Sequence, residues 1–143
     1  MGGGHGRPRH SGGTAAGLAL GLRLAGLRTR VLGVVVNDTL RLDTPTLTKS
    51  ARKSLALLRD RGVGLPEAES SPSDVVTEYG WLGTGYAHPT AQGAAALDRA
   101  RSEAGRALEQ TYTAKAFAAF LELDAAGRFG GEPVVLLNTF GPR

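Results

Sequence analysis

Four segments of the sequence carry residue types that could bind an anion or move a proton. The first is a Ser-Gly-Gly-Thr segment at the start of an apolar, helix-like stretch; its residues are Ser11, Gly12, Gly13 and Thr14. Two glycines allow close backbone approach to an oxyanion, and hydroxyl and N–H groups at a helix start bind anions. The segment therefore predicts a phosphate-binding loop that needs no lysine, although a Gly-Gly pair before a helix is also typical of a simple turn.

The second and third segments each contain a tyrosine. Residues 79–90 intersperse glycines with aromatic residues and include Tyr86. Such a loop can line a small-molecule pocket or fill a gap in a core. Residues 108–116 bring Tyr112 and Thr113 to a predicted helix start, where Thr113 could equally be an ordinary N-cap. Both segments are candidates for ligand contact or proton transfer, with a structural role as the alternative.

The fourth segment comprises residues 137–141 and contains Thr139. It begins at the end of a short apolar run at residues 134–137. We interpret this run as a buried strand. Ligands of open α/β sheets bind outside the carboxyl ends of the strands, so a hydroxyl here is expected on the binding side of the sheet.

Alternating helices and strands must position these segments. Apolar residues at helical spacing, an N-cap at Thr90 and terminating glycines predict helices at 11–24, 46–61, 90–108 and 113–126. Continuous apolar runs predict strands at 31–36, 75–79 and 134–137. The first helix is apolar on nearly every side and the first strand is rich in valine, so we expect both to be buried all round. The predicted fold class is α/β, a parallel sheet of roughly three strands with flanking helices.

The composition excludes several kinds of chemistry. The chain has 143 residues and no cysteine, which excludes a disulfide scaffold, thiolate metal sites, iron–sulfur clusters and a cysteine nucleophile. Its histidines, at positions 5, 10 and 88, are too few and too scattered to predict a metal centre. The net charge is +4, and the basic residues are concentrated in residues 1–61. Because few aromatic residues interleave with them, they indicate solvated helix faces rather than a nucleic-acid site.

The start of the chain superficially resembles a secretory signal, with a basic stretch followed by an apolar one. Three arginines, at positions 23, 28 and 30, then follow without a small-residue cleavage site. No uncharged apolar run approaches the roughly 20 residues that a membrane-spanning helix needs. We therefore expect a cytoplasmic protein that does not enter a membrane.

Together the four segments resemble the D-cysteine desulfhydrase/1-aminocyclopropane-1-carboxylate deaminase family. The shared pattern runs from residue 11 to about residue 141 as Ser-Gly-Gly-Thr-x-Ala-Gly-Leu, Gly-x-Gly-Tyr-x-x-Pro-Thr, Leu-x-x-x-Tyr-Thr-x-Lys-Ala and a strand ending in Thr-x-Gly. Members of the family are pyridoxal-phosphate enzymes of fold type II, with a tryptophan-synthase β-like fold. The resemblance implies the C-terminal half of the large domain, a pyridoxal 5'-phosphate cofactor, and a lyase or deaminase reaction on a small amino-acid substrate.

The resemblance also implies a role for each candidate residue. Residues 11–14 would hold the cofactor phosphate at the helix start. Tyr86 and Tyr112 align with active-site tyrosines that sit over cofactor and substrate, where a phenol suits proton transfer if the nearby pyridinium lowers its proton affinity. Thr113 and Thr139 fall where the family places a side chain beside the pyridine nitrogen. A neutral hydroxyl there would moderate the electron sink and favour elimination.

The sequence departs from the family pattern at four motif positions and in its N-terminal region. His10, Ala114 and Phe140 replace glycines and Asn138 replaces a frequent histidine, which weakens the assignment of Thr139 most. Family members also carry a long N-terminal part with the lysine that forms the Schiff base. The three lysines here do not match it, because two lie on a predicted solvated helix face and the third matches a different family lysine; they are Lys49, Lys53 and Lys115.

We therefore expect residues 1–10 to be a disordered or non-native start and residues 11–143 to be a partial cofactor-binding domain that is inactive alone. The expected partner is a complementing N-terminal chain or a second copy in a homodimer. Two other functions stay open. One is a non-catalytic module that binds pyridoxal phosphate, and the less favoured one is a basic nucleic-acid-binding protein.

Overall fold

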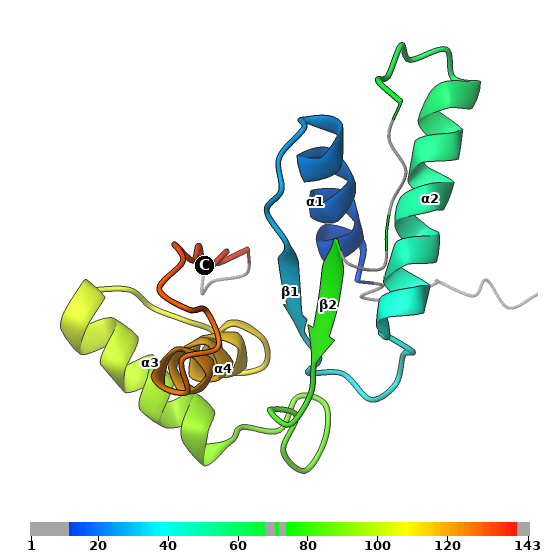
Figure 1. Cartoon of the computed structure of the whole chain (residues 1–143). Coiled ribbons are helices and arrows are strands. Elements are labelled where there is room, and N and C mark those ends of the chain that lie inside the picture. Colours follow the sequence, from blue (N-terminus) through cyan, green and yellow to red (C-terminus); the bar gives the residue numbers. More distant parts are fainter. Residues whose placement is uncertain (1–11, 68–70, 72–73, 140–143) are drawn as a thin grey trace, which may run out of the picture. The chain divides into compact units, whose positions relative to one another are not determined.

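The computed structural model describes residues 12–67, 71 and 74–139 of the chain (Figure 1). The elements follow in the order α1 (Gly13–Leu24), β1 (Val31–Val34), α2 (Thr44–Asp60), β2 (Val75–Glu78), α3 (Ala91–Ala104) and α4 (Thr113–Ala125). The chain divides into two compact units, residues 1–33 with 40–77 and residues 34–39 with 78–143. Within the described ranges, no helix has both the length and the apolar character to cross a bilayer.

The first unit combines the parallel strand pair β1–β2 with helices α1 and α2 (Figure 1). The N–H of Val31 donates to Asp74 at 2.9 Å and that of Val35 to Glu78 at 2.8 Å, so the two strands advance in the same direction. One buried cluster joins the two helices, and a second joins both helices to the sheet. Their members are Ala16, Leu20, Ala51 and Leu55, and Ala19, Leu47 and Val75.

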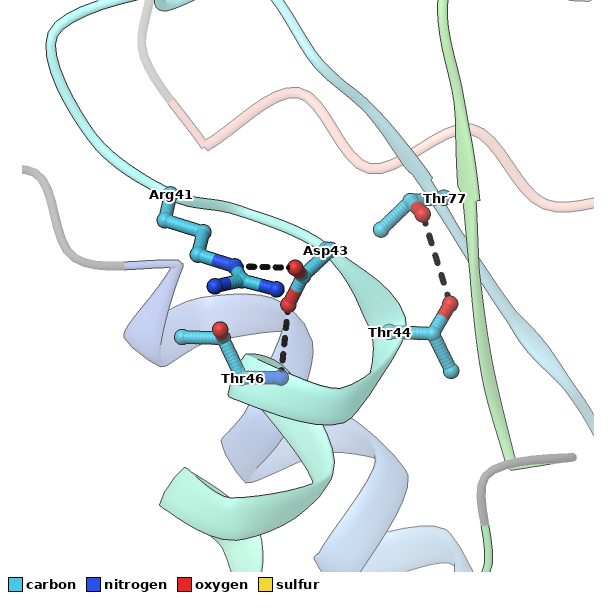
Figure 2. A network of polar contacts seen from close by, with 5 residues as sticks. All are labelled: Arg41, Asp43, Thr44, Thr46 and Thr77. Carbon is cyan, nitrogen blue, oxygen red and sulfur yellow. Dashed lines mark hydrogen bonds and ion pairs between the residues drawn. The ribbon is translucent and has the colours of Figure 1, made fainter.

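A network of polar side chains holds the start of α2 (Figure 2). Asp43 is the N-cap residue, and its Oδ1 accepts a hydrogen bond from the Thr46 N–H at 2.9 Å. Its other carboxylate oxygen pairs with the Arg41 guanidinium. The hydroxyls of Thr44 and Thr77 lie 3.3 Å apart, which joins the first turn of α2 to β2. These contacts explain why α2 begins at Thr44, slightly before the predicted start.

The Asp43 cap should make the stability of the chain depend on acid pH. Hydrogen bonds from Thr46, followed by the Arg41 contact, lower the pKa of the Asp43 carboxyl to about 2. A lowered pKa stabilises the fold above the unfolded value near pH 4, and this contribution is lost as pH falls towards 2. Asp43→Asn keeps a capping oxygen but does not titrate. We expect its denaturant midpoint to fall less than that of the wild type between pH 4 and pH 2, and parallel curves would contradict this.

The second unit packs α3 against α4, with a buried cluster of Ala100, Leu108 and Ala114 between them. As predicted, Thr90 is the N-cap of α3, and its hydroxyl accepts from the Gly93 N–H at 3.0 Å. Helix α3 ends at Ala104, before the predicted end near residue 108, because Gly105 adopts a left-handed conformation with φ of 59°.

Three expectations about strands and burial are wrong for the described residues. Residues 132–139 form an irregular segment rather than a strand, and Val135 is 82% exposed. A strand requires a hydrogen-bonded neighbour, and the described part of the sheet consists of β1 and β2 alone. Helix α1 buries one face, through Ala16, Ala19 and Leu20, rather than its whole circumference. In β1, Leu32 is 38% exposed, so this strand is not buried on both faces.

Candidate cofactor-binding and active site

In the first unit, one group of candidate residues lies at the start of α1. Gly12 is its N-cap residue, with a left-handed φ of 68°, and no side chain caps the helix. Gly13 and Thr14 are exposed, and the first turn of α1 contains no acidic residue. The first N–H groups of a helix have no intrahelical partner and carry partial positive charge, so this end can receive a phosphate. Ser11, the remaining predicted member, lies outside the described residues.

Packing against α2 requires glycine at position 12. A Cβ built on Gly12 would overlap the Leu47 side chain and come within 3.2 Å of Leu42 Cδ2. Leu47 is only 3% exposed and belongs to the buried cluster with Ala19 and Val75, so its side chain has little room to move. The positive φ and the close approach both demand glycine, which accounts physically for one of the two glycines singled out in the sequence.

A second group of candidate residues is a pair of tyrosines in the second unit. Tyr86 lies in the loop between β2 and α3, and Tyr112 is the N-cap residue of α4. Their hydroxyls share a hydrogen bond, and their ring centroids are 6.0 Å apart with the planes tilted by 57°. Both side chains are partly buried. The structure therefore brings together two tyrosines that are 26 positions apart in the sequence.

The loop that carries Tyr86 is closely folded. Gly83 has a φ of 73°, and a Cβ there would lie 2.5 Å from Thr90 Cγ2. Gly85 is buried, with space beside it limited by His88 and Asp38. Directly after Tyr86, Ala87 takes a φ of 66°, a conformation that costs a non-glycine residue about 1–2 kcal/mol. Strain of this kind next to a candidate reactive side chain is typical of functional loops.

Glu109 organises the backbone around Tyr112. Its carboxylate accepts hydrogen bonds from the N–H groups of Thr111 and Tyr112, at 2.6 and 2.9 Å. The role of Glu109 was not predicted from the sequence. A carboxylate that precedes a helix start by three or four positions and can bond the following backbone N–H groups was the available signal.

The surroundings of Tyr112 favour its protonated form. Burial raises the pKa of the Tyr112 phenol above its usual range, and the hydrogen bond with Tyr86 and the nearby Glu109 act in the same direction. The described residues of the chain therefore do not supply the lowered proton affinity considered in the sequence analysis. At neutral pH this phenol is therefore protonated and can donate a hydrogen bond.

The two predicted threonines have different environments. Thr113 is buried and is the first residue of α4, rather than its N-cap. Its hydroxyl accepts from the Glu109 N–H at 2.7 Å and donates to the Glu109 carbonyl at 3.2 Å. Thr139 is exposed, in the irregular segment that follows α4. The structure thus gathers Thr113 with Tyr112, whereas the strand that should present Thr139 is not formed.

Comparison with known proteins identifies the family. The family described as "Pyridoxal-phosphate dependent enzyme" matches residues 8–139. The chain belongs to this family. Members depend on pyridoxal phosphate, so the family assignment agrees with the cofactor inferred from the sequence. Among curated proteins, none matches the chain.

A solved structure gives a more specific likeness. The chain is similar to a protein described as "Crystal Structure Analysis of the ACC deaminase homologue", with 26% sequence identity and a TM-score of 0.62. The match covers 82% of this chain but only 33% of that protein. The similarity supports the α/β arrangement of a fold type II pyridoxal-phosphate enzyme, and it concerns about a third of such a protein.

The described residues fit part of a pyridoxal-phosphate site. The uncapped start of α1 matches the chemistry of a phosphate group, because backbone N–H groups and the Thr14 hydroxyl can all donate there. The lysines fit less well. Lys49 and Lys53 are exposed on α2, whereas Lys115 is buried and its amine donates to the Leu82 carbonyl. None of the three resembles an amine held free for the cofactor aldehyde.

Proposed function

We propose that this chain is the C-terminal part of a pyridoxal-phosphate-dependent lyase or deaminase that acts on a small amino acid, in the manner of a D-cysteine desulfhydrase or a 1-aminocyclopropane-1-carboxylate deaminase. The observation that carries the proposal is the Tyr86–Tyr112 hydroxyl pair, which joins two motifs of the expected active site. The match to the ACC deaminase homologue over 82% of this chain supports the same reading. Action in the cytoplasm is part of the proposal.

Each part of the chain has a distinct task in this proposal. Bound pyridoxal phosphate supplies an electron sink for the substrate carbanion. The backbone N–H groups at Gly13 and Thr14, with the Thr14 hydroxyl and Ser11, bind its phosphate. Tyr112 and Tyr86 hold a proton beside the substrate and deliver it through their shared hydrogen bond. The raised pKa of Tyr112 keeps its phenol protonated at neutral pH, and delivery of the proton would require the nearby pyridinium to lower that pKa.

Thr113 and Thr139 are proposed to face the pyridine nitrogen. A hydroxyl is a weaker partner for a protonated nitrogen than a carboxylate, so the electron sink would be moderate and elimination would be favoured. The Thr113 hydroxyl proton is directed to the Glu109 carbonyl at 3.2 Å, so its oxygen would meet a neighbouring group mainly as an acceptor. The Thr139 assignment rests on the sequence resemblance alone.

A second polypeptide segment is proposed to supply the lysine that holds the cofactor covalently. The chain spans about a third of the solved relative, and its own lysines are either exposed on α2 or buried and hydrogen-bonded. In this proposal residues 11–143 act as a partial cofactor-binding domain. A lysine-bearing polypeptide would complete the site, and the isolated chain would bind cofactor without turnover.

A cofactor-binding experiment tests this proposal. Pyridoxal phosphate is titrated into the purified chain and followed by its absorbance, with equilibrium dialysis as a second measure. We expect saturable binding that Thr14→Ala weakens by about 10- to 100-fold, because it removes a hydrogen bond to a charged group. The matched control is Tyr112→Phe, which should bind as the wild type does. Absence of saturable binding by the wild type would overturn the proposal.

Borohydride reduction separates catalysis from binding alone. We expect reduction to attach no cofactor permanently to the isolated chain, and to attach it to a lysine of the complementing polypeptide once that is added. The lysine environments favour the non-catalytic module as the second candidate. That candidate predicts saturable binding with no covalent attachment and no ammonia release whichever polypeptide is added.

A further inference from the structure

Lys115 is a buried cation that the proposed reaction does not use. It is the third residue of α4 and has 0% of its surface exposed. Its Nζ donates a hydrogen bond to the backbone carbonyl of Leu82 at 2.7 Å. Leu82 lies in the loop that carries Tyr86, four positions before that tyrosine. The amine thus joins the helix that begins beside Tyr112 to the loop that presents Tyr86.

The stem of Lys115 also contacts the start of α3. A Cβ on Gly93 would lie 3.6 Å from Lys115 Cγ and 2.9 Å from the Thr90 hydroxyl that caps this helix. A Cβ at position 93 would therefore crowd the hydroxyl that caps the helix, while it would meet the lysine stem at ordinary van der Waals distance. Lys115 accordingly meets the Tyr86 loop at Leu82 through its amine and lies beside Gly93, in the first turn of α3, through its stem.

Two carboxylates compensate the buried charge. Burial lowers the pKa of Lys115, and the negative charges of Glu109 and Asp38 oppose this effect. Asp38, which follows β1, lies close to Gly85 of the Tyr86 loop. Glu109 accepts a hydrogen bond from the backbone N–H of Tyr112. Of the two charges that interact with the amine, Glu109 therefore lies on the segment that carries Tyr112, and Asp38 lies beside the loop that carries Tyr86.

We propose that Lys115 is a positioning residue that fixes the Tyr86 loop on the start of α4 and so holds the two phenol hydroxyls in hydrogen-bond contact. It acts through the Leu82 carbonyl and does not touch the reacting atoms. This role rests on the proposed function of Tyr86 and Tyr112, but the geometry that it controls is a property of the chain without cofactor.

The test observes the phenol pair directly in the full chain. Tyrosine is labelled with ¹³C at Cζ, and NMR records the Cζ resonances of Tyr86 and Tyr112 together with amide exchange in residues 83–88. In Lys115→Met the aliphatic length is kept and the donor is lost. We expect both Cζ resonances to move towards the position of a solvated tyrosine, and amide exchange in the loop to rise by at least about tenfold.

Leu123→Ala is the matched control, because Leu123 is buried on the same helix, 7% exposed, eight positions further along. It should lower stability but leave the tyrosine resonances unchanged. Lys115→Arg keeps a donor and should restore slow loop exchange at least in part. If Lys115→Met does not fold, Lys115→Gln, whose shorter side chain cannot span the same distance, is measured in its place.

Two results would overturn the inference. One is a folded Lys115→Met or Lys115→Gln chain with wild-type tyrosine resonances and loop exchange. The other is an equal change in Leu123→Ala, which would reveal a general loss of stability. Neither readout needs cofactor or turnover, so a failure of pyridoxal-phosphate binding remains distinguishable from a failure of this role.

Discussion

Replacing Tyr112 with phenylalanine is expected to lower ammonia release by about 10²–10⁴-fold in the proposed enzyme, measured with the proposed lysine-bearing polypeptide added. A positioned acid–base group typically contributes this much to a reaction rate. Tyr112→Phe also removes the hydroxyl to which Tyr86 is bonded, so both proton-carrying groups are affected by one change. The phosphate loop lies in the other unit, so cofactor binding should be retained. Steady-state kinetics and cofactor titration on the same preparation measure the two effects.

Tyr79→Phe provides the matched control for this substitution. Tyr79 is 56% exposed and is not a member of the phenol pair, so its replacement should change turnover by less than about twofold. Equal turnover in Tyr112→Phe and Tyr79→Phe would contradict the proton-transfer role. A loss of cofactor binding in Tyr112→Phe would instead show that the tyrosine supports the fold of the cofactor site.

Substituting alanine for Gly12 should lower the free energy of unfolding by about 2 kcal/mol and abolish measurable cofactor binding. The left-handed φ of 68° alone costs alanine about 1–2 kcal/mol, and the new Cβ overlaps Leu47. The chain must relax by moving the helix start, which changes the direction of the N–H groups that receive the phosphate. Denaturant unfolding and cofactor titration measure the two consequences.

Gly17→Ala is the control for a glycine change in the same helix. Gly17 lies inside α1, and no heavy atom lies within 4 Å of the position that its Cβ would take. Alanine is the better helix former, so this variant should be more stable than the wild type by roughly 0.5–1 kcal/mol and should bind cofactor normally. If Gly12→Ala behaved like Gly17→Ala, glycine would not be required at the proposed phosphate loop.

Local signals predicted the helices well. The caps at Thr90 and the glycines after each helix act over one turn, so their effect can be deduced from the residues themselves. The predicted helices at 46–61 and 113–126 correspond to α2 and α4 within two residues at either end. The strand predicted at residues 134–137 was wrong. A short apolar run is compatible with a buried strand and with an exposed segment, and only a hydrogen-bonded neighbouring strand decides between them.

For the candidate site too, some features could be predicted from the sequence and others depended on the tertiary structure. The sequence alone indicated the candidate residues, namely the glycines and hydroxyls at the start of α1 and both tyrosines. Their pattern also predicted the pyridoxal-phosphate family, which the family match confirms. Only the tertiary structure decided that Tyr86 and Tyr112 meet, that Glu109 holds the backbone at Tyr112, and that Lys115 is buried against Leu82. Residue type and spacing reveal chemical capacity and local conformation. Contacts between residues tens of positions apart depend on how helices and loops pack, which no local pattern encodes.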